Sequence, residues 1–232
     1  MNELHNEANQ WIQVDNFQDF ISTNFEGQKN AICWHRKLEG DFAEIVDKVH
    51  FSGNMIELEE DDLMHLELSE EGQLAREILL NDLRLFREFG AAPILNVIKN
   101  YEEDNELSFF ATDVYSFHID RSDVPSDTIL CTYYGDSSEI IPNDQAVQKI
   151  QIPEIRQKLH ELHQGPATEF DTFLKEYFFD LHYDVDPSAK PIQLGNGHIW
   201  RLAIDHPTQI VLPCIHRAPK EISQKRRLLL IC

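Results

Sequence analysis

Three residues of this chain have types and a spacing that suit the binding of one metal ion. His118 and Asp120 are two positions apart in an apolar, aromatic-rich segment, and His216 follows a second apolar segment 96 positions after Asp120. Side chains two apart on an extended segment point the same way, so His118 and Asp120 can hold one ion together. Two histidines and one carboxylate on a single face bind Fe(II) and leave positions open for a cosubstrate and oxygen.

A second His-x-Asp pair, His182-Tyr-Asp184, is an alternative to the first. His118 ends a strand-like segment and precedes a polar loop over residues 120–126, as a ligand at a sheet edge would. His182 instead follows an amphipathic helical segment and lies only 34 residues before His216. The context therefore favours His118 and Asp120 as the pair that joins His216.

Two arginines follow His216 at a spacing that suits the binding of a carboxylate near the metal. Arg226 and Arg227 stand ten and eleven residues after it, directly before the apolar run Leu-Leu-Leu-Ile-Cys. In this the chain resembles the Fe(II)/2-oxoglutarate-dependent oxygenase superfamily, in which an arginine at the start of the strand after the distal histidine binds the far carboxylate of 2-oxoglutarate. A planar guanidinium suits that task because it donates two charge-assisted hydrogen bonds to a carboxylate. The ten-residue spacing from His216 favours Arg226 as the residue that binds 2-oxoglutarate, whereas the position directly before the apolar run favours Arg227. They point to opposite faces of a strand, so only one can serve.

The resemblance covers roughly residues 109–232 and implies a double-stranded β-helix core, of the jelly-roll or cupin-like kind. It implies Fe(II) on His118, Asp120 and His216, with 2-oxoglutarate as cosubstrate. A polar side chain on the strand after His-x-Asp often supports the cosubstrate in this superfamily, and Tyr133 or Tyr134 is expected there. Each tyrosine can equally be an aromatic residue packed in the barrel.

The chain also resembles an uncharacterised bacterial family in two short motifs. These are Cys-Thr-Tyr-x-Gly at residues 131–135 and His-Arg-x-Pro at residues 216–219. That family has no established substrate, so this second resemblance adds no activity.

The elements that must position these residues divide the chain into two parts of an α+β fold. Residues 1–105 are expected to form a mainly helical flank, with a helix over residues 73–89 ended by Gly90 and one short strand at residues 31–34. Residues 106–232 are expected to form the β core, with a helical insert at about 153–182. Asn196-Gly197 between two apolar runs predicts a hairpin. The expected core strands are 107–119, 128–134, 138–141, 191–194, 198–204, 209–215 and 227–232.

Composition excludes several classes of function. The chain has 232 residues, 42% hydrophobic and 26% charged, which is typical of a globular domain. Its formal net charge of −21 repels phosphate backbones, so no nucleic-acid partner is expected. No apolar run is long enough to cross a membrane, and the polar, acidic N-terminus is unlike a secretory signal, so a cytoplasmic location is expected.

Two other functions remain open on the sequence alone. A cupin-like β-barrel would bind a metal without using a 2-oxo acid, and neither Arg226 nor Arg227 would then matter. A non-catalytic interaction protein would dock a basic partner on its acidic helical flank and bind no metal. For the oxygenase, the expected substrate is an unidentified small molecule or peptide.

Overall fold

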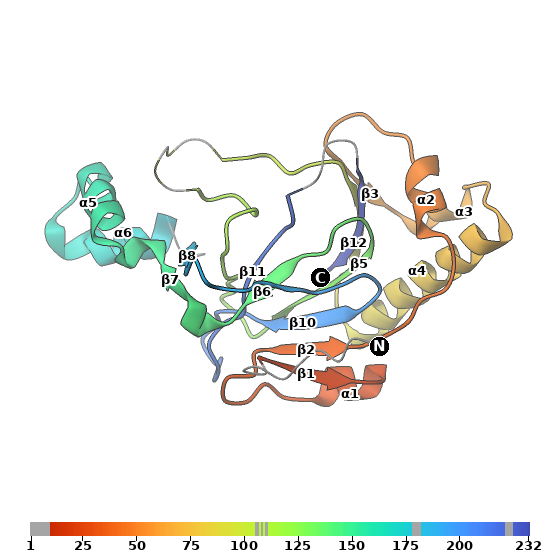
Figure 1. The fold of residues 1–232 in the computed structure, drawn as a ribbon, viewed down its shortest axis with the longest axis horizontal. Coiled ribbons are helices and arrows are strands. Elements are labelled where there is room, and N and C mark those ends of the chain that lie inside the picture. Colours follow the sequence, from red (N-terminus) through yellow and green to blue (C-terminus); the bar gives the residue numbers. More distant parts are fainter. Residues whose placement is uncertain (1–9, 105–106, 108, 110, 178–181, 221–224) are drawn as a thin grey trace.

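A seven-stranded sheet crosses the middle of the molecule, with helices on one face and a smaller sheet on the other (Figure 1). The computed structural model describes residues 10–104, 107, 109, 111–177, 182–220 and 225–232. Among the described strands of the large sheet, β1 and β2 pair in parallel and the other neighbours pair antiparallel. In spatial order the strands are β1 (Trp11–Val14), β2 (Ala31–Trp34), β10 (Ile199–Ala203), β5 (Asp127–Tyr134), β12 (Arg227–Ile231), β4 (Ile94–Ile98) and β3 (Met55–Leu58).

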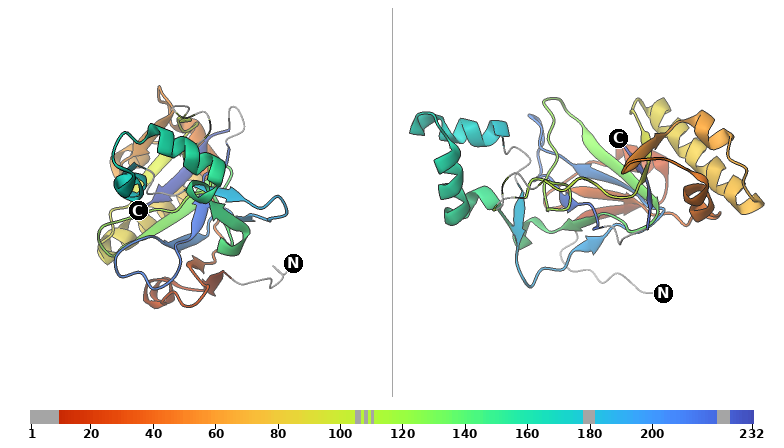
Figure 2. Two further views of the ribbon diagram at one scale, coloured as in Figure 1. Left: turned by 90° about the vertical axis from the view of Figure 1, so that its left-hand side faces the viewer. Right: turned by 90° about the horizontal axis from the view of Figure 1, so that it is seen from above.

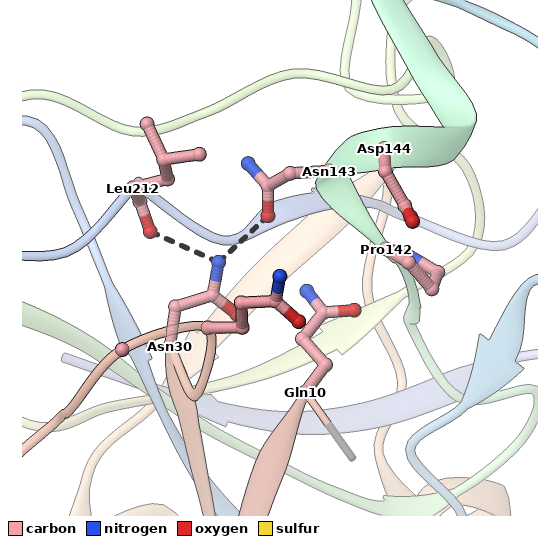
Figure 3. A pocket seen from close by; sticks show the side chains of 8 residues that line it. Gln10, Asn30, Pro142, Asn143, Asp144 and Leu212 are labelled. Atoms are coloured by element: carbon pink, nitrogen blue, oxygen red, sulfur yellow. Dashed lines mark hydrogen bonds between the residues drawn. The ribbon is translucent and has the colours of Figure 1, made fainter. Parts of the chain in front are cut away.

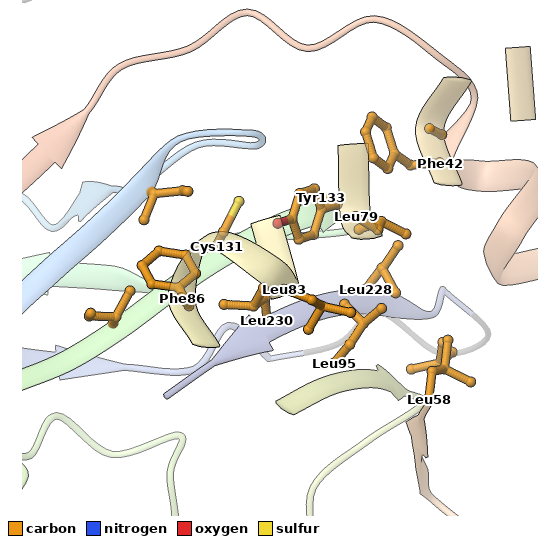
Figure 4. Packing of buried hydrophobic residues seen from close by; sticks show 14 of the residues in the cluster. Phe42, Leu58, Leu79, Leu83, Phe86, Leu95, Cys131, Tyr133, Leu228 and Leu230 are labelled. Carbon is orange, nitrogen blue, oxygen red and sulfur yellow. The ribbon is translucent and has the colours of Figure 1, made fainter. Parts of the chain in front are cut away.

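Four helices from the first ninety residues cover one face of this sheet. They are α1 (Phe17–Ser22), α2 (Phe42–Lys48), α3 (Glu60–Met64) and α4 (Glu70–Phe89). In α4, Ser69 accepts a hydrogen bond from the Gly72 amide at the N-cap, and Gly90 ends the helix with a left-handed φ of 95°. The apolar stripe of α4 packs on alternate residues of β5 and β12, as Figure 4 shows for Leu79, Leu83 and Phe86.

The small sheet packs on the opposite face and consists of β11 (Ile215–Arg217), β6 (Glu139–Ile141) and β9 (Ile192–Gln193). An isolated antiparallel bridge between His118 and His216 adds the segment at residue 118 to its edge. Apolar side chains of both sheets fill the layer between them, including Leu130 and Trp200 from the large sheet and Ile140 from the small one. The chain passes repeatedly from one sheet to the other, which brings distant segments together between the two layers.

A separate helical lobe extends from the end of the molecule opposite α2–α4 (Figures 1 and 2). The two-stranded ribbon of β7 (Ala146–Gln148) and β8 (Tyr183–Val185) leads to α5 (Pro153–Leu162) and α6 (Phe170–Tyr177). Leu159, Phe170 and Leu174 form a small apolar cluster of their own inside this lobe. The expected helical insert is therefore present in the described residues, and its ribbon is anchored to the small sheet by the Tyr183 amide, which donates to the Phe117 carbonyl at 2.7 Å.

The expected combination of helices with a β core is confirmed, and the large sheet is mostly antiparallel. Within the described part of the chain, no strand pairing closes the two sheets into a barrel. The first hundred residues are less helical than predicted, because three further strands join the large sheet in addition to the expected strand at residues 31–34: β1 next to it, and β4 and β3 at the opposite edge. These strands of four or five residues are too short for a period-2 pattern to stand out against the helices around them.

Three other local predictions are wrong. Residues 111–117 form turns and loops instead of a strand, and residues 108 and 110 of that segment lie outside the described residues. Residues 209–214 form a loop, so His216 is the middle residue of β11 and does not close a longer strand. Asn196-Gly197 makes a turn, but β9 pairs with β6 while β10 pairs with β2 and β5. The turn therefore carries the chain between sheets and is not a hairpin.

None of the helices in the described residues is long and apolar enough to cross a membrane.

Candidate metal centre

His118 and His216 face each other across the edge of the small sheet. Each backbone amide donates to the other residue's carbonyl at 2.9 Å, so the two form a reciprocal antiparallel pair. Side chains of such a pair lie on the same face, and the imidazole centroids are 4.6 Å apart. Residues nearly a hundred positions apart are thus fixed together by backbone hydrogen bonds.

Alternation along β11 and β6 decides which way these histidines point. Ile215 and Ile141 are register partners whose side chains join the cluster on the outer face of the small sheet. His216 and Ile140 are the next partners, and Ile140 packs in the layer between the two sheets. Because successive side chains alternate, His216 points into that layer, and His118 opposite it does the same.

Asp120 completes the group from the loop that follows His118. Its carboxylate oxygens lie 3.9 Å from His118 Nε2 and 3.4 Å from His216 Nε2. The Thr128 hydroxyl on β5 donates a hydrogen bond to Asp120 Oδ2, and the Asp205 amide donates to the Asp120 carbonyl at 2.9 Å. One ligand atom from each of the three residues lies within 4.8 Å of the others. The large sheet therefore holds the carboxylate while the small sheet holds both imidazoles.

Hydrogen bonds to backbone carbonyls orient both imidazoles. His118 Nδ1 lies 2.7 Å from the Ser116 carbonyl and His216 Nδ1 lies 3.2 Å from the Cys214 carbonyl. A carbonyl only accepts, so each Nδ1 carries a proton, and each Nε2 is the ring nitrogen turned toward Asp120. Backbone carbonyls in this role fix the tautomer and the orientation of a ligating histidine.

The charge state of the group also suits a cation. Burial, and then the neighbouring His216, lowers the pKa of His118 to about 4. Burial alone would raise the pKa of Asp120, but His216 and the hydrogen bond from Thr128 hold it below its ordinary value. At neutral pH His118 is neutral and Asp120 is ionised, so no proton has to leave either group before a metal binds. The donor set fits a divalent first-row transition metal bound through two nitrogens and one oxygen.

His182 lies beside this group, although the sequence favoured His118 over it. Its ring centroid is 5.5 Å from that of His118, and its side chain is buried. Asp184 is exposed on β8 and is not part of the cluster of ligand atoms. The alternative pair His182-Tyr-Asp184 is thus split by the structure, with only the histidine near the centre. The second His-x-Asp motif was the available signal, but it gave no indication that the histidine alone would approach.

The structure separates the two arginines that the sequence could not distinguish. Arg226 Nη1 donates to the carbonyls of Val46 and Val49 at 2.9 and 2.7 Å, which places it at the C-terminal end of α2 on the helical face. Arg227 is 1% exposed and its Nη2 donates to the hydroxyls of Thr132 and Ser138 at 3.0 and 2.7 Å.

Those two hydroxyls place Arg227 in the layer between the sheets. Thr132 lies on β5, two residues beyond Leu130 of the inner layer, and Ser138 directly precedes β6 of the small sheet. Leu229, two residues after Arg227, also packs in this layer, as strand alternation requires. Arg227 therefore lies on the same face of the large sheet as Thr128, and Arg226 lies on the opposite face.

Neither tyrosine faces the metal-ligand group. The Tyr133 hydroxyl donates to Asp82 Oδ2 of α4 at 2.6 Å, and its ring stacks on Phe42 at 5.4 Å (Figure 4). Tyr134 packs against the same helix-side cluster. The structure does not support the cosubstrate role predicted for Tyr133 and Tyr134. It supports the alternative, in which both tyrosines pack as aromatic residues. Thr132, between Cys131 and Tyr133, instead turns toward the inner layer, as Leu130 of the same strand does.

No protein-family model, curated protein or solved structure matches this chain.

Proposed function

We propose that this protein is an Fe(II)- and 2-oxoglutarate-dependent oxygenase acting on a small molecule or peptide. One observation carries the proposal: two imidazole nitrogens and a carboxylate oxygen lie within 4.8 Å of one another, on residues fixed by backbone hydrogen bonds. That is the ligand set of the facial triad, which leaves part of the coordination sphere open for cosubstrate and oxygen.

The strand arrangement supports the fold that this function implies. A jelly roll distributes eight antiparallel strands over two packed sheets. Here β4, β5, β10 and β12 are consecutive in the large sheet, while β6, β9, β11 and the bridged segment at His118 form the small one. We interpret these seven strands and the bridged segment as the eight core segments of a jelly roll, with β1, β2 and β3 as extensions at the edges of the large sheet.

The position of Arg227 supports a dicarboxylate cosubstrate. Thr128 contacts Asp120 and Thr132 contacts Arg227, and both threonines lie on the inner face of β5. Four residues of extended strand separate their Cα atoms by about 13 Å. Side chains reaching inward from both ends shorten that gap, so a small diacid fits between a metal at one end and the guanidinium at the other.

Each residue has a distinct task in this proposal. When bound, Fe(II) with 2-oxoglutarate supplies the oxidising chemistry that hydroxylates a substrate carbon. His118 and His216 offer Nε2 lone pairs, Asp120 adds one negative charge, and Thr128 keeps the carboxylate turned toward the histidines. Arg227 neutralises the far carboxylate of the cosubstrate, and the hydroxyls on Thr132 and Ser138 hold its fork in place.

The direct test reconstitutes the protein with Fe(II) without oxygen, measures bound iron, and then follows succinate formation from 2-oxoglutarate after oxygen is admitted. We expect about one iron per chain, lost in Asp120→Ala. We expect Arg227→Met to keep the iron but lose 2-oxoglutarate binding. Arg226→Met is the matched control, since it removes the neighbouring guanidinium, which lies on the opposite, helical face of the large sheet.

Three results would contradict the proposal. Iron binding that survives in Asp120→Ala would show that the metal sits elsewhere. Equal effects of Arg226→Met and Arg227→Met on 2-oxoglutarate binding would remove the role of Arg227. Iron binding with no affinity for 2-oxoglutarate would leave a metal protein of another class. Circular dichroism of each variant separates these results from loss of folding.

A further inference from the structure

A small cavity lies where the turns at residues 27–30 and 142–144 meet the loop before β11. Its volume is about 230 Å³, and the labelled side chains in Figure 3 include Gln10, Asn30, Asn143, Asp144 and Leu212. This is below the range of about 300–1,000 Å³ typical of drug-sized ligands. Any ligand of this cavity is therefore small.

Asn30 presents an acceptor that lacks a donor. It is 2% exposed, and its Nδ2 donates to Asn143 Oδ1, the Leu212 carbonyl and the Pro213 carbonyl at 2.8, 2.9 and 3.3 Å. Three surrounding acceptors fix which end of the amide is nitrogen. Asn30 Oδ1 is then buried with no hydrogen-bond partner among the described residues. A buried acceptor without a donor is destabilising, so a site of this kind needs an explanation.

Gln10 presents a second buried acceptor that lacks a donor. It is 4% exposed, its Nε2 makes a weak contact of 3.6 Å with Cys214 Sγ, and its Oε1 has no partner within the described chain. Figure 3 shows this carboxamide directed from the start of β1 toward Pro142 and Asp144. This weak N–H···S contact is the one hydrogen bond found for the carboxamide in the described residues, so little opposes its rotation.

The charge around the cavity indicates what would supply the missing donors. Among the residues that the structure describes, its lining includes the carboxylate of Asp144 and no lysine, arginine or histidine. The chain as a whole carries a formal net charge of −21. Acceptor oxygens beside a carboxylate attract a group that donates several hydrogen bonds and carries positive charge.

We propose that this cavity binds a small molecule through a primary ammonium group. The ammonium donates to the carboxamide oxygens of Gln10 and Asn30 and is balanced by Asp144 at the exposed side, while Pro142 and Leu212 contact the short carbon chain. The site shares its wall with the loop at residues 212–214, which Asn30 and Asn143 hold by hydrogen bonds and which leads directly into His216. It is separate from the metal-ligand group and does not depend on the proposed oxygenase activity.

Three probes of equal length test the ammonium requirement. Calorimetric titration of the metal-free protein uses 1,4-diaminobutane, butane-1,4-diol and succinate, which differ only in the terminal groups. We expect binding of the diamine and none of succinate, with the diol at least tenfold weaker, the factor expected when a hydrogen-bonding group loses its charge. Equal binding of diol and diamine would overturn the proposal, as would no diamine binding in protein shown to be folded.

Variants then locate the site. Gln10→Leu keeps the volume of the side chain and removes the acceptor, and Asp144→Asn removes the charge at the exposed side. Each is expected to weaken diamine binding about tenfold or more. Asp171→Asn is the control, because Asp171 is an exposed carboxylate on α6, outside the cavity lining. If Asp171→Asn weakens binding as much as Asp144→Asn does, the diamine is responding to overall charge and the cavity is not its site.

Discussion

The buried ion pair between Arg36 and Asp82 gives the sharpest test of how the helical face is held to the sheet. Asp82 on α4 is 1% exposed, and Arg36 Nη1 lies 2.8 Å from both of its carboxylate oxygens. The Tyr133 hydroxyl on β5 donates to the same carboxylate at 2.6 Å. Asp82→Ala would leave a guanidinium that is 9% exposed without its carboxylate and would leave a buried hydroxyl without its acceptor.

The expected loss is large for a single side chain. Breaking a buried pair from one side costs about 3–5 kcal/mol, because the remaining charge stays desolvated. For a domain of this length about 4 kcal/mol corresponds to a fall in Tm of roughly 8–16 °C. Replacing both partners together, as in Arg36→Met with Asp82→Leu, should cost far less, since no charge is then left buried.

Urea unfolding followed by tryptophan fluorescence measures this loss of stability, because the Arg36 guanidinium lies over the Trp34 ring, 4.8 Å from its centroid. The midpoint should fall for Asp82→Ala with little change in the slope of free energy against urea. Glu88→Ala is the surface control: its pair with Arg84 spans 4.0 Å with both side chains about two-thirds exposed, and such pairs contribute at most about 0.5 kcal/mol. Equal losses for Asp82→Ala and Glu88→Ala, or a double variant as unstable as Asp82→Ala, would refute the reasoning.

Three further outcomes are expected. The metal-free protein should lose about 2 kcal/mol of stability between pH 7 and pH 5 through His118. The pKa of His118 is about 6.5 in the unfolded chain and about 4 in the folded protein. The unfolded chain therefore takes up more protons than the folded protein as the pH falls, which favours unfolding. Urea unfolding at both pH values should show this, and His118→Asn should remove it. Cys33 and Cys131 should react with a disulfide reagent far more slowly in the native protein than in denaturant, because burial raises the pKa of both thiols to about 12. Prompt reaction of these thiols in the native state would contradict this expectation. Gly90→Ala should cost about 1 kcal/mol, since no atom would crowd the new Cβ and only the left-handed φ of 95° opposes it; an unchanged Tm would show that the helix ends without that conformation.

Local sequence patterns were sufficient where one element contains its own signals. The helix α4 has an apolar stripe, a serine at its N-cap and Gly90 at its end, so its type and its C-terminal end could be predicted without knowledge of its neighbours. The strands at residues 127–134 and 227–231 were long and apolar enough to be recognised in the same way. The short strands β1, β3 and β4 were not, because their pairing partners stabilise them and the sequence does not name those partners.

The same division holds at the candidate metal centre. Residue type and the His-x-Asp spacing singled out His118, Asp120 and His216, and the structure brings their ligand atoms together, while their role as metal ligands stays a prediction. Sequence alone could say that Arg226 and Arg227 lie on opposite faces of a strand, since alternation is a local property. Which face meets the helices and which meets the small sheet depends on the pairing of β12 with β4 and β5, and on the layer packed against each side. The approach of His182 to His118 likewise depends on the β7–β8 ribbon docking beside residue 117, a contact between segments more than sixty residues apart.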